Sequence, residues 1–263
     1  MPTNPRINLN ADLGESFGPW VMGEDDALLD VVSSANLACG FHAGDPDVMR
    51  RTVRACVAKG VSIGAHPGYH DLQGFGRRAL KLSHTEIENL VAYQVGALAG
   101  VAALEGGRVT HVKPHGALNN QACADAGIAA AICRAVRGID PGLILLAPAA
   151  SALLAAGREA GLPVVEEIFA DRAYQDDGQL APRGTPGAMV HGAENCAAHV
   201  QAMLAEKALI ALSGKRIPTA IGSVCVHGDG PGAVAVARHL RQALAAAGWE
   251  IASLPALMPA SGG

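Results

Sequence analysis

Aromatic residues are scarce in this sequence of 263 residues: Phe, Trp and Tyr together make up 3%, although half of all residues are hydrophobic. This scarcity, with 32 glycines and abundant alanine, favours closely packed helices and strands over an aromatic-rich β-sandwich. A chain of this length buries an ample core as one domain, and α/β barrels commonly reach this size. We therefore expect a single domain over residues 1–263.

Secreted, membrane-spanning and nucleic-acid-binding proteins are disfavoured by what the sequence lacks. The six cysteines show no CxxC spacing and no tight disulfide framework, which is typical of buried, reduced thiols in a cytoplasmic protein. The N-terminus lacks an apolar signal region, and no run approaches the ~18 apolar residues of a membrane helix. The net charge of −4 leaves no electrostatic footprint for nucleic acid. We expect a cytoplasmic protein that binds neither membranes nor nucleic acid.

Nucleotide-binding motifs are missing as well. No GxGxxG follows the first predicted strand, as a dinucleotide fold would usually show. No GxxxxGK[ST] occurs either: Ser213-Gly214-Lys215-Arg216 is the nearest imitation, and it lacks both the first glycine and the hydroxyl residue. An open doubly wound sheet is therefore less favoured than a barrel.

The sequence does contain a regular alternation of apolar strands and helices. Strands are predicted from Ile7 onward and at 34–39, 61–65, 109–113, 143–147, 164–168 and 223–226, with a further candidate at 249–254. Helices are predicted at 24–32, 46–59, 84–105, 122–137, after 147, at 194–213 and at 233–247. Such alternation is typical of parallel strands that are buried on both faces. It predicts an α/β fold, a TIM-like (β/α) barrel of seven or eight parallel strands.

Local signals mark the ends of two helices. Asp45 is expected to cap the helix that begins at Pro46, and Gly60 lies just beyond its end. Ser83 and Glu86 form an S-x-x-E capping box at the start of the next helix.

Polar residues follow six of the predicted strands, and in a barrel these positions meet at one face, where the active site is expected. The first strand carries Asn8, Asn10, Asp12 and Glu15. Burying these groups costs desolvation that a simple core strand avoids. The first strand is therefore expected to contribute to a site.

Asp12, His42 and His66 stand at or just past the ends of consecutive predicted strands. One carboxylate with two imidazoles is a plausible ligand set for a divalent metal, with positions left open for water and substrate. A hydrogen-bonded polar network without metal explains the same residues equally well.

Lys113 ends the fourth predicted strand and is followed by His115 and Asn119. A lysine that leaves an apolar strand is rarely buried without a partner. In the barrel mouth it could hold a carboxylate or polarise a carbonyl oxygen, with His115 for proton transfer and Asn119 for an amide hydrogen bond. A solvated strand end is the less favoured alternative.

The loop after the third strand contains Tyr69, Asp71, Arg77 and Arg78 among several glycines. The glycines allow close backbone approach, and the paired arginines suit a carboxylate or phosphate unless they pair with surface acids. The sequence alone favours neither outcome.

The loop after the sixth strand holds Asp171, Arg172, Tyr174 and Arg183. It is too long for a mere connection, so we expect a lid or a surface that contacts a further chain.

His227 and Asp229 belong to the run HGDGPG at 227–232, after the seventh strand. A helix N-terminus behind a glycine-rich turn is a natural anion site. The remaining histidines that lie within elements or at helix ends are expected to be structural: His84, His111, His191, His199 and His239.

Together, the motifs NLNADLGE, NLACGFHAGDP, GAHPGYHDLQGFGRR, HVKPHGALNN, EEIFADRAYQDDGQL and CVHGDGPGA closely resemble the LamB/YcsF family. The resemblance covers about 7–254, with every block in family order and no departure at the polar positions. It implies a barrel related to the glycoside hydrolase/deacetylase superfamily. It also implies a role in the ATP-dependent opening of 5-oxo-L-proline to L-glutamate, together with two partner subunits, B and C.

The implied reaction assigns roles to the residues. A five-membered lactam is a stable amide, and phosphorylation of its carbonyl oxygen by ATP would make that oxygen a better leaving group. The site then needs a group for the substrate carboxylate, donors for the oxyanion and a base for water. The expected catalytic residues are Asp12, His66, Lys113 and His115. The expected substrate-binding residues are Asn10, Glu15, Tyr69, Arg77, Asn119, His227 and Asp229.

Two other functions stay open: a stand-alone metal-dependent amide or N-acyl hydrolase that is active without ATP, and a non-catalytic ligand-binding scaffold. The ionisable groups after six strands argue against a pure scaffold. The sequence leaves open whether a divalent metal is bound, whether the ATP site is shared with partner subunits, and whether the chain forms a homodimer.

Overall fold

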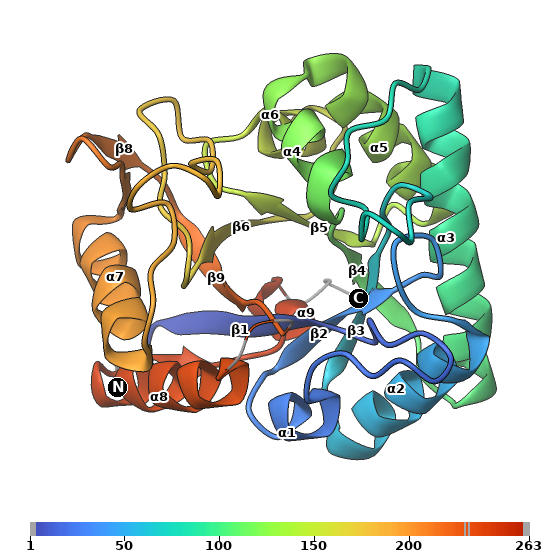
Figure 1. Cartoon of the computed structure of the whole chain (residues 1–263), viewed down its shortest axis with the longest axis horizontal. Helices are drawn as coiled ribbons and strands as arrows, with labels where there is room; N and C mark the ends of the chain where they lie inside the picture. Colours follow the sequence, from blue (N-terminus) through green and yellow to red (C-terminus); the bar gives the residue numbers. More distant parts are fainter. Residues whose placement is uncertain (1–3, 229, 231, 260–263) are drawn as a thin grey trace.

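Seven parallel strands close into a barrel at the centre of the molecule (Figure 1). The computed structural model describes residues 4–228, 230 and 232–259. The last barrel strand pairs back with the first, with Asn8 opposite Ser223 and Asn10 opposite Cys225. The predicted (β/α) barrel is confirmed, with seven strands in the closed ring. These strands are β1 (Arg6–Leu13), β2 (Ser34–Ala38), β3 (Ser62–His66), β4 (Val109–Val112), β5 (Ile144–Pro148), β6 (Val164–Phe169) and β9 (Ile221–Val226).

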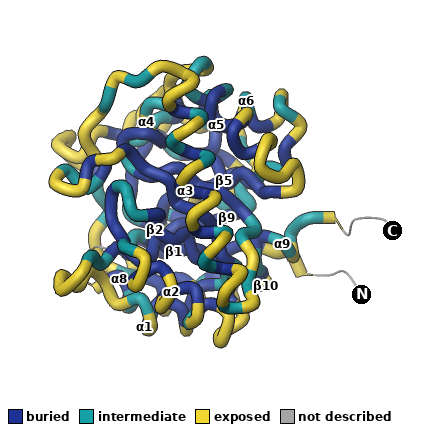
Figure 2. The backbone as a smooth tube through the Cα atoms, turned by 90° about the vertical axis from the view of Figure 1, so that its right-hand side faces the viewer, coloured by how far each residue is buried: buried dark blue, intermediate teal, exposed yellow. Residues whose placement is uncertain are grey.

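Helices surround the ring, and the strands lie buried beneath them (Figures 1 and 2). The capping box predicted from Ser83 and Glu86 is present at the start of α3 (His84–Leu104). Asp45 caps α2 (Pro46–Lys59) as predicted, accepting hydrogen bonds from two backbone N–H groups. The other helices are α1 (Asp25–Leu29), α4 (Gly116–Ala124), α5 (Ala126–Ile139), α6 (Ala152–Glu159), α7 (Ala193–Glu206), α8 (Ala233–Ala246) and α9 (Leu254–Leu257).

By length and composition alone, α3 could cross a membrane, a property not anticipated from the sequence. In the fold it packs against α2 and α5. Its apolar residues Ile87, Val91 and Leu98 are fully buried in the hydrophobic core. The helix therefore forms part of the outer layer of the barrel.

The helix predicted at 194–213 is shorter in the structure. It ends at Glu206, because Lys207 adopts the left-handed conformation with φ of 50°. The chain then forms an antiparallel hairpin of β7 (Ala208–Ile210) and β8 (Arg216–Pro218). Apolar periodicity continued past the true end because these strand residues are also apolar.

Two further predictions differ from the structure. The helix predicted at 122–137 is two helices, α4 and α5, which meet at Asp125; its side chain caps the second helix by accepting from two backbone N–H groups. The strand predicted at 249–254 is reduced to β10 (Glu250–Ile251), which pairs with the beginning of β1 outside the closed ring. In both cases a local cap or turn ends an element that hydrophobic pattern alone extended.

The inside of the barrel is polar, unlike the aliphatic filling of a typical (β/α) barrel. Alternate residues of β1 point inward, namely Asn8, Asn10 and Asp12, while the intervening Leu9 packs in the hydrophobic core. The amide nitrogen of Asn10 reaches Glu167 Oε1 on β6 at 2.8 Å. A series of polar side chains thus leads from the middle of the barrel to its mouth.

Gly64 of β3 makes room for this polar interior. A Cβ at Gly64 would lie 2.1 Å from Nε2 of His111, which fills the space and hydrogen-bonds with Asn36 Oδ1 at 3.0 Å. Burial, and then the charge of Lys113, lower the pKa of His111 to about 3. His111 is therefore a neutral support for the barrel interior at physiological pH.

Candidate active site

A cavity of about 530 Å³ opens at the carboxyl ends of the barrel strands. Its lining comes from the segments at or after the ends of β1, β3, β4, β6 and β9, the face where (β/α) barrels place their active sites. The structure therefore brings together most of the residues that the sequence singled out. The predicted site residues that line the cavity are Asp12, Glu15, His66, Arg77, Lys113, His115, Asn119 and His227.

Of the other four predicted residues, three have other positions. Tyr69 is fully buried, and its hydroxyl donates to Gln121 Oε1 at 2.6 Å. Asn10 lies in the barrel interior, and His42 lines a second cavity beside the first. Asp229 lies outside the described residues.

The adjacent arginines of the loop after β3 have different surroundings. Arg77 lines the cavity, with its guanidinium 4.8 Å from the centroid of the Phe75 ring. Arg78 forms an ion pair with Asp71, which is only 5% exposed. Arg78 therefore pairs with a buried acid rather than with a surface acid.

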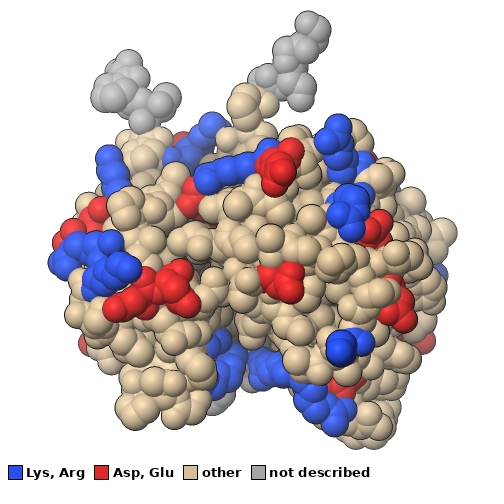
Figure 3. All heavy atoms as spheres, turned by 90° about the horizontal axis from the view of Figure 1, so that it is seen from above, with Lys and Arg blue, Asp and Glu red and all other residues tan. Residues whose placement is uncertain are grey.

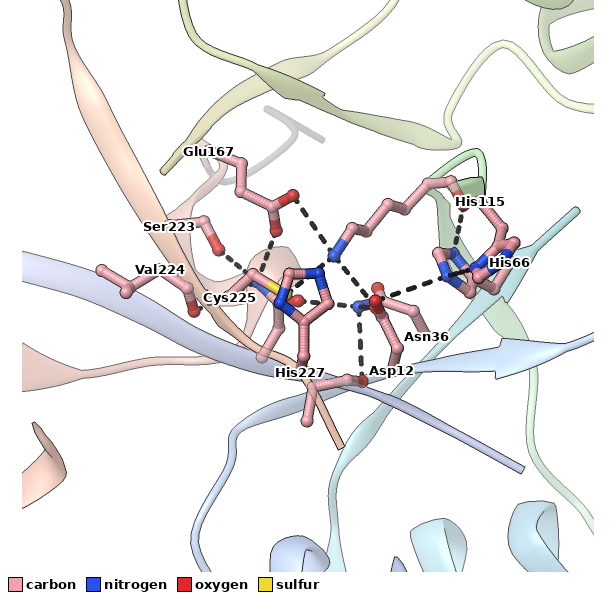
Figure 4. A network of polar contacts seen from close by, with 12 residues as sticks. Asp12, Asn36, His66, His115, Glu167, Ser223, Val224, Cys225 and His227 are labelled. Atoms are coloured by element: carbon pink, nitrogen blue, oxygen red, sulfur yellow. Dashed lines mark hydrogen bonds and ion pairs between the residues drawn. The ribbon is translucent and has the colours of Figure 1, made fainter. Parts of the chain in front are cut away.

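Lys113 is the centre of the cavity floor and is only 3% exposed. Its ammonium donates to Asp12 Oδ1 and to Cys225 Sγ, each at 2.9 Å, and lies 3.3 Å from Glu167 Oε2; Figure 4 shows these three residues converging on one point. Burial disfavours the charge, but the neighbouring carboxylates hold the pKa of Lys113 well above its ordinary value. The floor therefore carries a fixed positive charge that can polarise a carbonyl oxygen.

Asp12 is the ionised partner of this lysine. Its Oδ1 also accepts from the amide of Asn36 at 2.9 Å, and its Oδ2 lies 3.5 Å from His66 Nε2. Burial raises the pKa of Asp12, but His66 and Lys113 outweigh burial and hold the pKa well below its ordinary value.

Glu167 was missed in the sequence, although a signal for it was present. Two adjacent acids, Glu166 and Glu167, interrupt an apolar strand, and only one of two neighbours can face the barrel interior. Glu167 is the inward one and is fully buried, whereas Glu166 pairs with Arg158. Burial raises the pKa of Glu167 even with Lys113 beside it.

Hydrogen bonds determine which ring nitrogens of His66 and His115 carry a proton. His66 Nδ1 lies 2.6 Å from the carbonyl oxygen of Lys113, and His115 Nε2 lies 2.8 Å from that of Phe75, so both nitrogens donate. In the neutral rings, His66 Nε2 and His115 Nδ1 are then both acceptors, yet they face each other at 3.0 Å. Two lone pairs at this distance repel each other unless a proton or a cation lies between them.

The surroundings of this histidine pair fit a divalent metal. Glu15, His42, His66 and His115 each place one ligand atom within 4.8 Å of the others. Burial holds the pKa of His42 well below its ordinary value and lowers that of His115 to about 3, so both rings are in the neutral, metal-binding form. Backbone carbonyls that accept from the far ring nitrogens are a common support of metal-binding histidines. The predicted ligand Asp12 lies beside this cluster, 3.5 Å from His66.

His227 and Asp171 form a second acid–histidine pair at the cavity. His227 Nδ1 lies 2.8 and 3.0 Å from the two carboxylate oxygens of Asp171, and its ring stacks on Phe169. Burial raises the pKa of Asp171, but His227 outweighs burial, so the pKa lies below its ordinary value. A carboxylate that holds Nδ1 as a donor leaves Nε2 to exchange protons, the usual arrangement of a histidine base. Sequence reasoning noted both residues but not their pairing.

Residues 7–259 of the chain match the LamB/YcsF family. The A subunit of the 5-oxoprolinase of Azoarcus sp. (strain BH72) is 64% identical over 250 residues, which cover 95% of this chain and 98% of that protein. The corresponding A subunit of the 5-oxoprolinase of Nitrobacter winogradskyi is 56% identical over 239 residues, 90% of this chain and 94% of that protein.

Solved structures agree with this relationship. The crystal structure of the lactam utilization protein from Thermus thermophilus superimposes with a TM-score of 0.89 at 44% identity, covering 95% of this chain and 100% of that chain. The catalytic domain of a peptidoglycan N-acetylglucosamine deacetylase from Eubacterium rectale, with a TM-score of 0.53 at 12% identity and coverage of 98% and 92%, shares the fold alone. The barrel therefore has the same fold as this deacetylase domain. With its motifs, its barrel and its match over nearly the whole length, the chain belongs to the LamB/YcsF family.

Proposed function

We propose that this chain is the A subunit of an ATP-dependent 5-oxoprolinase, which opens the lactam ring of 5-oxo-L-proline to L-glutamate. In balance, 5-oxoproline, ATP and two water molecules give glutamate, ADP and phosphate. The observation that carries the proposal is the charged Lys113 in the floor of a polar cavity, in a chain 64% identical to the A subunit of a 5-oxoprolinase.

Ring opening needs a polarised carbonyl group, a base for water and an acid for the departing amine. We assign the first task to Lys113, whose ammonium is held in place by Asp12 and donates to the carbonyl oxygen, or to that oxygen once it bears a phosphoryl group. The oxygen of one water molecule bonds to the carbonyl carbon, the C–N bond breaks, and the ring nitrogen takes up a proton to become the amine of glutamate. When the carbonyl oxygen bears the phosphoryl group, this step leaves an acyl phosphate, which the second water molecule hydrolyses to the side-chain carboxylate of glutamate and phosphate. Arg77 and Asn119 bind the substrate carboxylate.

Proton transfer is assigned to the histidines of the cavity. His227, oriented by Asp171, accepts the proton of water and returns it to the departing nitrogen. His66 and His115 stay in the catalytic set because their facing nitrogens can share a proton or bind a cation. A divalent metal held by the histidines and Glu15 would supply Lewis-acid polarisation.

Asn10 and Tyr69, which do not line the cavity, act through their neighbours. Asn10 holds the carboxyl group of Glu167 by a hydrogen bond of 2.8 Å, and Tyr69 holds the side chain of Gln121. Glu15 completes the proposed substrate-binding set as a wall of the cavity.

ATP, partner subunits B and C and a cytoplasmic location belong to the same proposal. We place the ATP site on one of the partners, because this sequence carries no Walker A loop and no GxGxxG follows its first strand. An apolar surface next to the site suits contact with a partner: Trp20 and Val21 are 70% and 85% exposed beside a cavity of about 320 Å³ that Glu15 and His42 also line.

The contact with partners can be tested by co-purification with subunits B and C. Trp20→Ser should weaken recovery of the complex, because a large exposed aromatic side chain is a typical anchor of an interface. Leu104→Ser, at an equally exposed apolar position at the end of α3, is the matched control and should leave recovery unchanged. Equal recovery of both variants would place the contact elsewhere.

The function itself is tested by glutamate release from 5-oxoproline, by this chain alone and with subunits B and C, with and without ATP. Turnover with ADP formation in the full mixture alone supports the proposal. No turnover in the full mixture contradicts it.

A stand-alone, metal-dependent amide hydrolase is the second candidate, favoured by the facing acceptor nitrogens of His66 and His115. It predicts stoichiometric bound metal and turnover of an amide without ATP or partners. Elemental analysis of wild type, His115→Gln and the control His239→Gln, in α8, tests the site directly. Loss of metal in His115→Gln alone supports the cluster as the ligand set, and equal metal in all three proteins contradicts it.

A further inference from the structure

Three arginines from two loops converge on the rim of the cavity. Arg77 comes from the loop after β3, and Arg172 and Arg183 come from the long segment after β6; all three line the cavity. Figure 3 shows Lys and Arg side chains on both sides of the hollow that opens on the face away from the two termini. The rim therefore carries three guanidinium groups.

Arg172 is the buried member of this group, at 7% exposure. One of its terminal nitrogens donates to the carbonyl of Ala181 at 2.7 Å, but its buried Nε has no hydrogen-bond partner. Burial, and then the positive charge of Arg183, lower the pKa of Arg172 below its ordinary value. Burying a guanidinium group beside a like charge and without enough hydrogen-bond acceptors costs free energy. A bound ligand that supplies the missing acceptors would offset this cost.

Arg172 and Arg183 also differ from other arginines of the chain in their partners. Within the described part of the chain, no carboxylate lies within ion-pair distance of either one; the contact of Arg183 is with the sulfur of Met189 at 3.8 Å. The arginines that do form ion pairs with carboxylates include Arg50, Arg54, Arg78, Arg134, Arg158 and Arg216. The acids of the cavity, Asp12 and Glu15, lie instead at Lys113 and at the histidine cluster.

We propose that Arg172 and Arg183 bind a phosphoryl group carried by the ligand of this cavity, beside Arg77, which binds the substrate carboxylate. A phosphoryl group brings about −1.5 to −2 charges and three acceptor oxygens, which suits several guanidinium groups better than one carboxylate does. The cavity of about 530 Å³ is larger than the small lactam requires, so it has room for a phosphorylated substrate. The identity of the ligand rests on the proposed ATP-coupled function; the anion site itself does not.

The segment that carries Arg172 is built as a fixed wall. The backbone of Ala173 donates to Ala188 and accepts from Ala181, and the carbonyl of Arg172 lies 2.9 Å from the ring Nε2 of His199 on α7. The hydroxyl of Tyr174 accepts from the backbone N–H of Phe169 at 2.9 Å. Arg172 is thus held at the cavity before any ligand arrives, which lowers the entropic cost of binding.

Binding of inorganic phosphate to the full chain, measured by titration calorimetry, tests the proposal without any requirement for turnover. Wild type should bind phosphate, and Arg183→Gln should weaken binding about 10- to 100-fold, the effect of losing a charge-assisted contact. Arg172→Gln should also weaken phosphate binding. Because Arg172 is buried, this variant could fail to fold. In that case Arg183→Gln, at an exposed position, tests the proposal by itself. Arg134→Gln, which removes a surface arginine paired with Glu88, is the matched control and should bind as wild type does.

The outcomes separate this inference from the proposed function. Phosphate binding that falls in the rim variants alone supports the anion site, even if the full mixture with partner subunits makes no glutamate. No phosphate binding by wild type, or equal binding by Arg183→Gln, overturns it. Acetate that competes with phosphate on equal terms would show a plain carboxylate site and would also overturn the assignment to a phosphoryl group.

Discussion

The floor and the rim of the cavity differ in whether their positive charges have carboxylate partners. At the floor, the ammonium of Lys113 lies 2.9 Å from Asp12 and 3.3 Å from Glu167. At the rim, Arg172 and Arg183 have no carboxylate partner among the residues that the structure describes, and the Nε of Arg172 is without a hydrogen bond. The charges at the floor are therefore paired with one another, although Glu167 Oε2 makes no hydrogen bond, whereas Arg172 and Arg183 have no such partner within the described residues.

The origin of the residues explains this difference. Floor residues extend from barrel strands, where the ladder of parallel pairing fixes which side chains face inward and at which height. Rim residues come from the loops after β3 and β6, which can vary without disturbing the ring. In the proposed mechanism, the strands therefore hold the partners that fix Lys113 against the reacting carbonyl group, and the loops supply arginines that recognise the ligand.

We expect the largest loss of stability and activity from replacement of Lys113, the cation at the floor of the cavity. In Lys113→Met, Asp12 and Glu167 lose their cation while buried, which should lower the free energy of unfolding by about 3–5 kcal/mol. Glutamate formation by the full complex should fall about 100-fold or more, because a preorganised donor to the reacting oxygen is lost. Urea unfolding and steady-state kinetics measure the two effects.

Lys59→Met is the control for that experiment. Lys59 pairs with Asp30 at the surface, where such a pair contributes about 0–1 kcal/mol. If Lys113→Met were as stable and as active as Lys59→Met, the floor would not depend on its charge.

Asp171→Asn should separate orientation of a base from stability of the fold. The amide no longer stabilises a protonated His227, so kcat should fall about 100-fold, the lower end of the contribution of general base catalysis. Asp26→Asn, at an exposed position in α1, should keep wild-type kcat. Unchanged kcat in Asp171→Asn would remove His227 from the proposed proton transfer.

Much of this architecture could be predicted from the sequence because it depends on local patterns. The caps at Asp45 and Ser83 and the alternation of strands and helices are readable within a few residues. Lys113 stood out because a charge that ends an apolar strand needs a partner.

The partners themselves could not be predicted. Asp171 and His227 lie on different barrel segments, and nothing local says that they meet. Likewise, the two acids of β6 are adjacent, and only the strand register turns Glu167 inward, toward Lys113. The register of the strands therefore determines which residues meet at the site, although the local sequence determines which residue types are available.

The barrel interior should make the protein sensitive to acid. The pKa of His111 is lowered by burial to about 3, below the ordinary value of 6.5, so the unfolded chain binds more protons between these pH values. The free energy of unfolding should therefore fall as the pH is lowered through this range, by up to about 1.4 kcal/mol per pH unit from this residue. In His111→Gln the pH dependence should be correspondingly shallower in urea titrations. Parallel curves for the two proteins would show that His111 does not contribute.

Replacement of Arg183 at the rim should change stability the least, in contrast to replacement of Lys113 at the floor. Arg183 is exposed and has no carboxylate partner within the described residues, so Arg183→Gln should change the free energy of unfolding by less than about 0.5 kcal/mol. Relief of its repulsion with Arg172 could even stabilise the protein slightly. Urea unfolding in phosphate-free buffer measures this change. A marked loss of stability would mean that Arg183 supports the fold. The proposed difference between floor charges that pair within the barrel and rim arginines that bind a ligand would then fail.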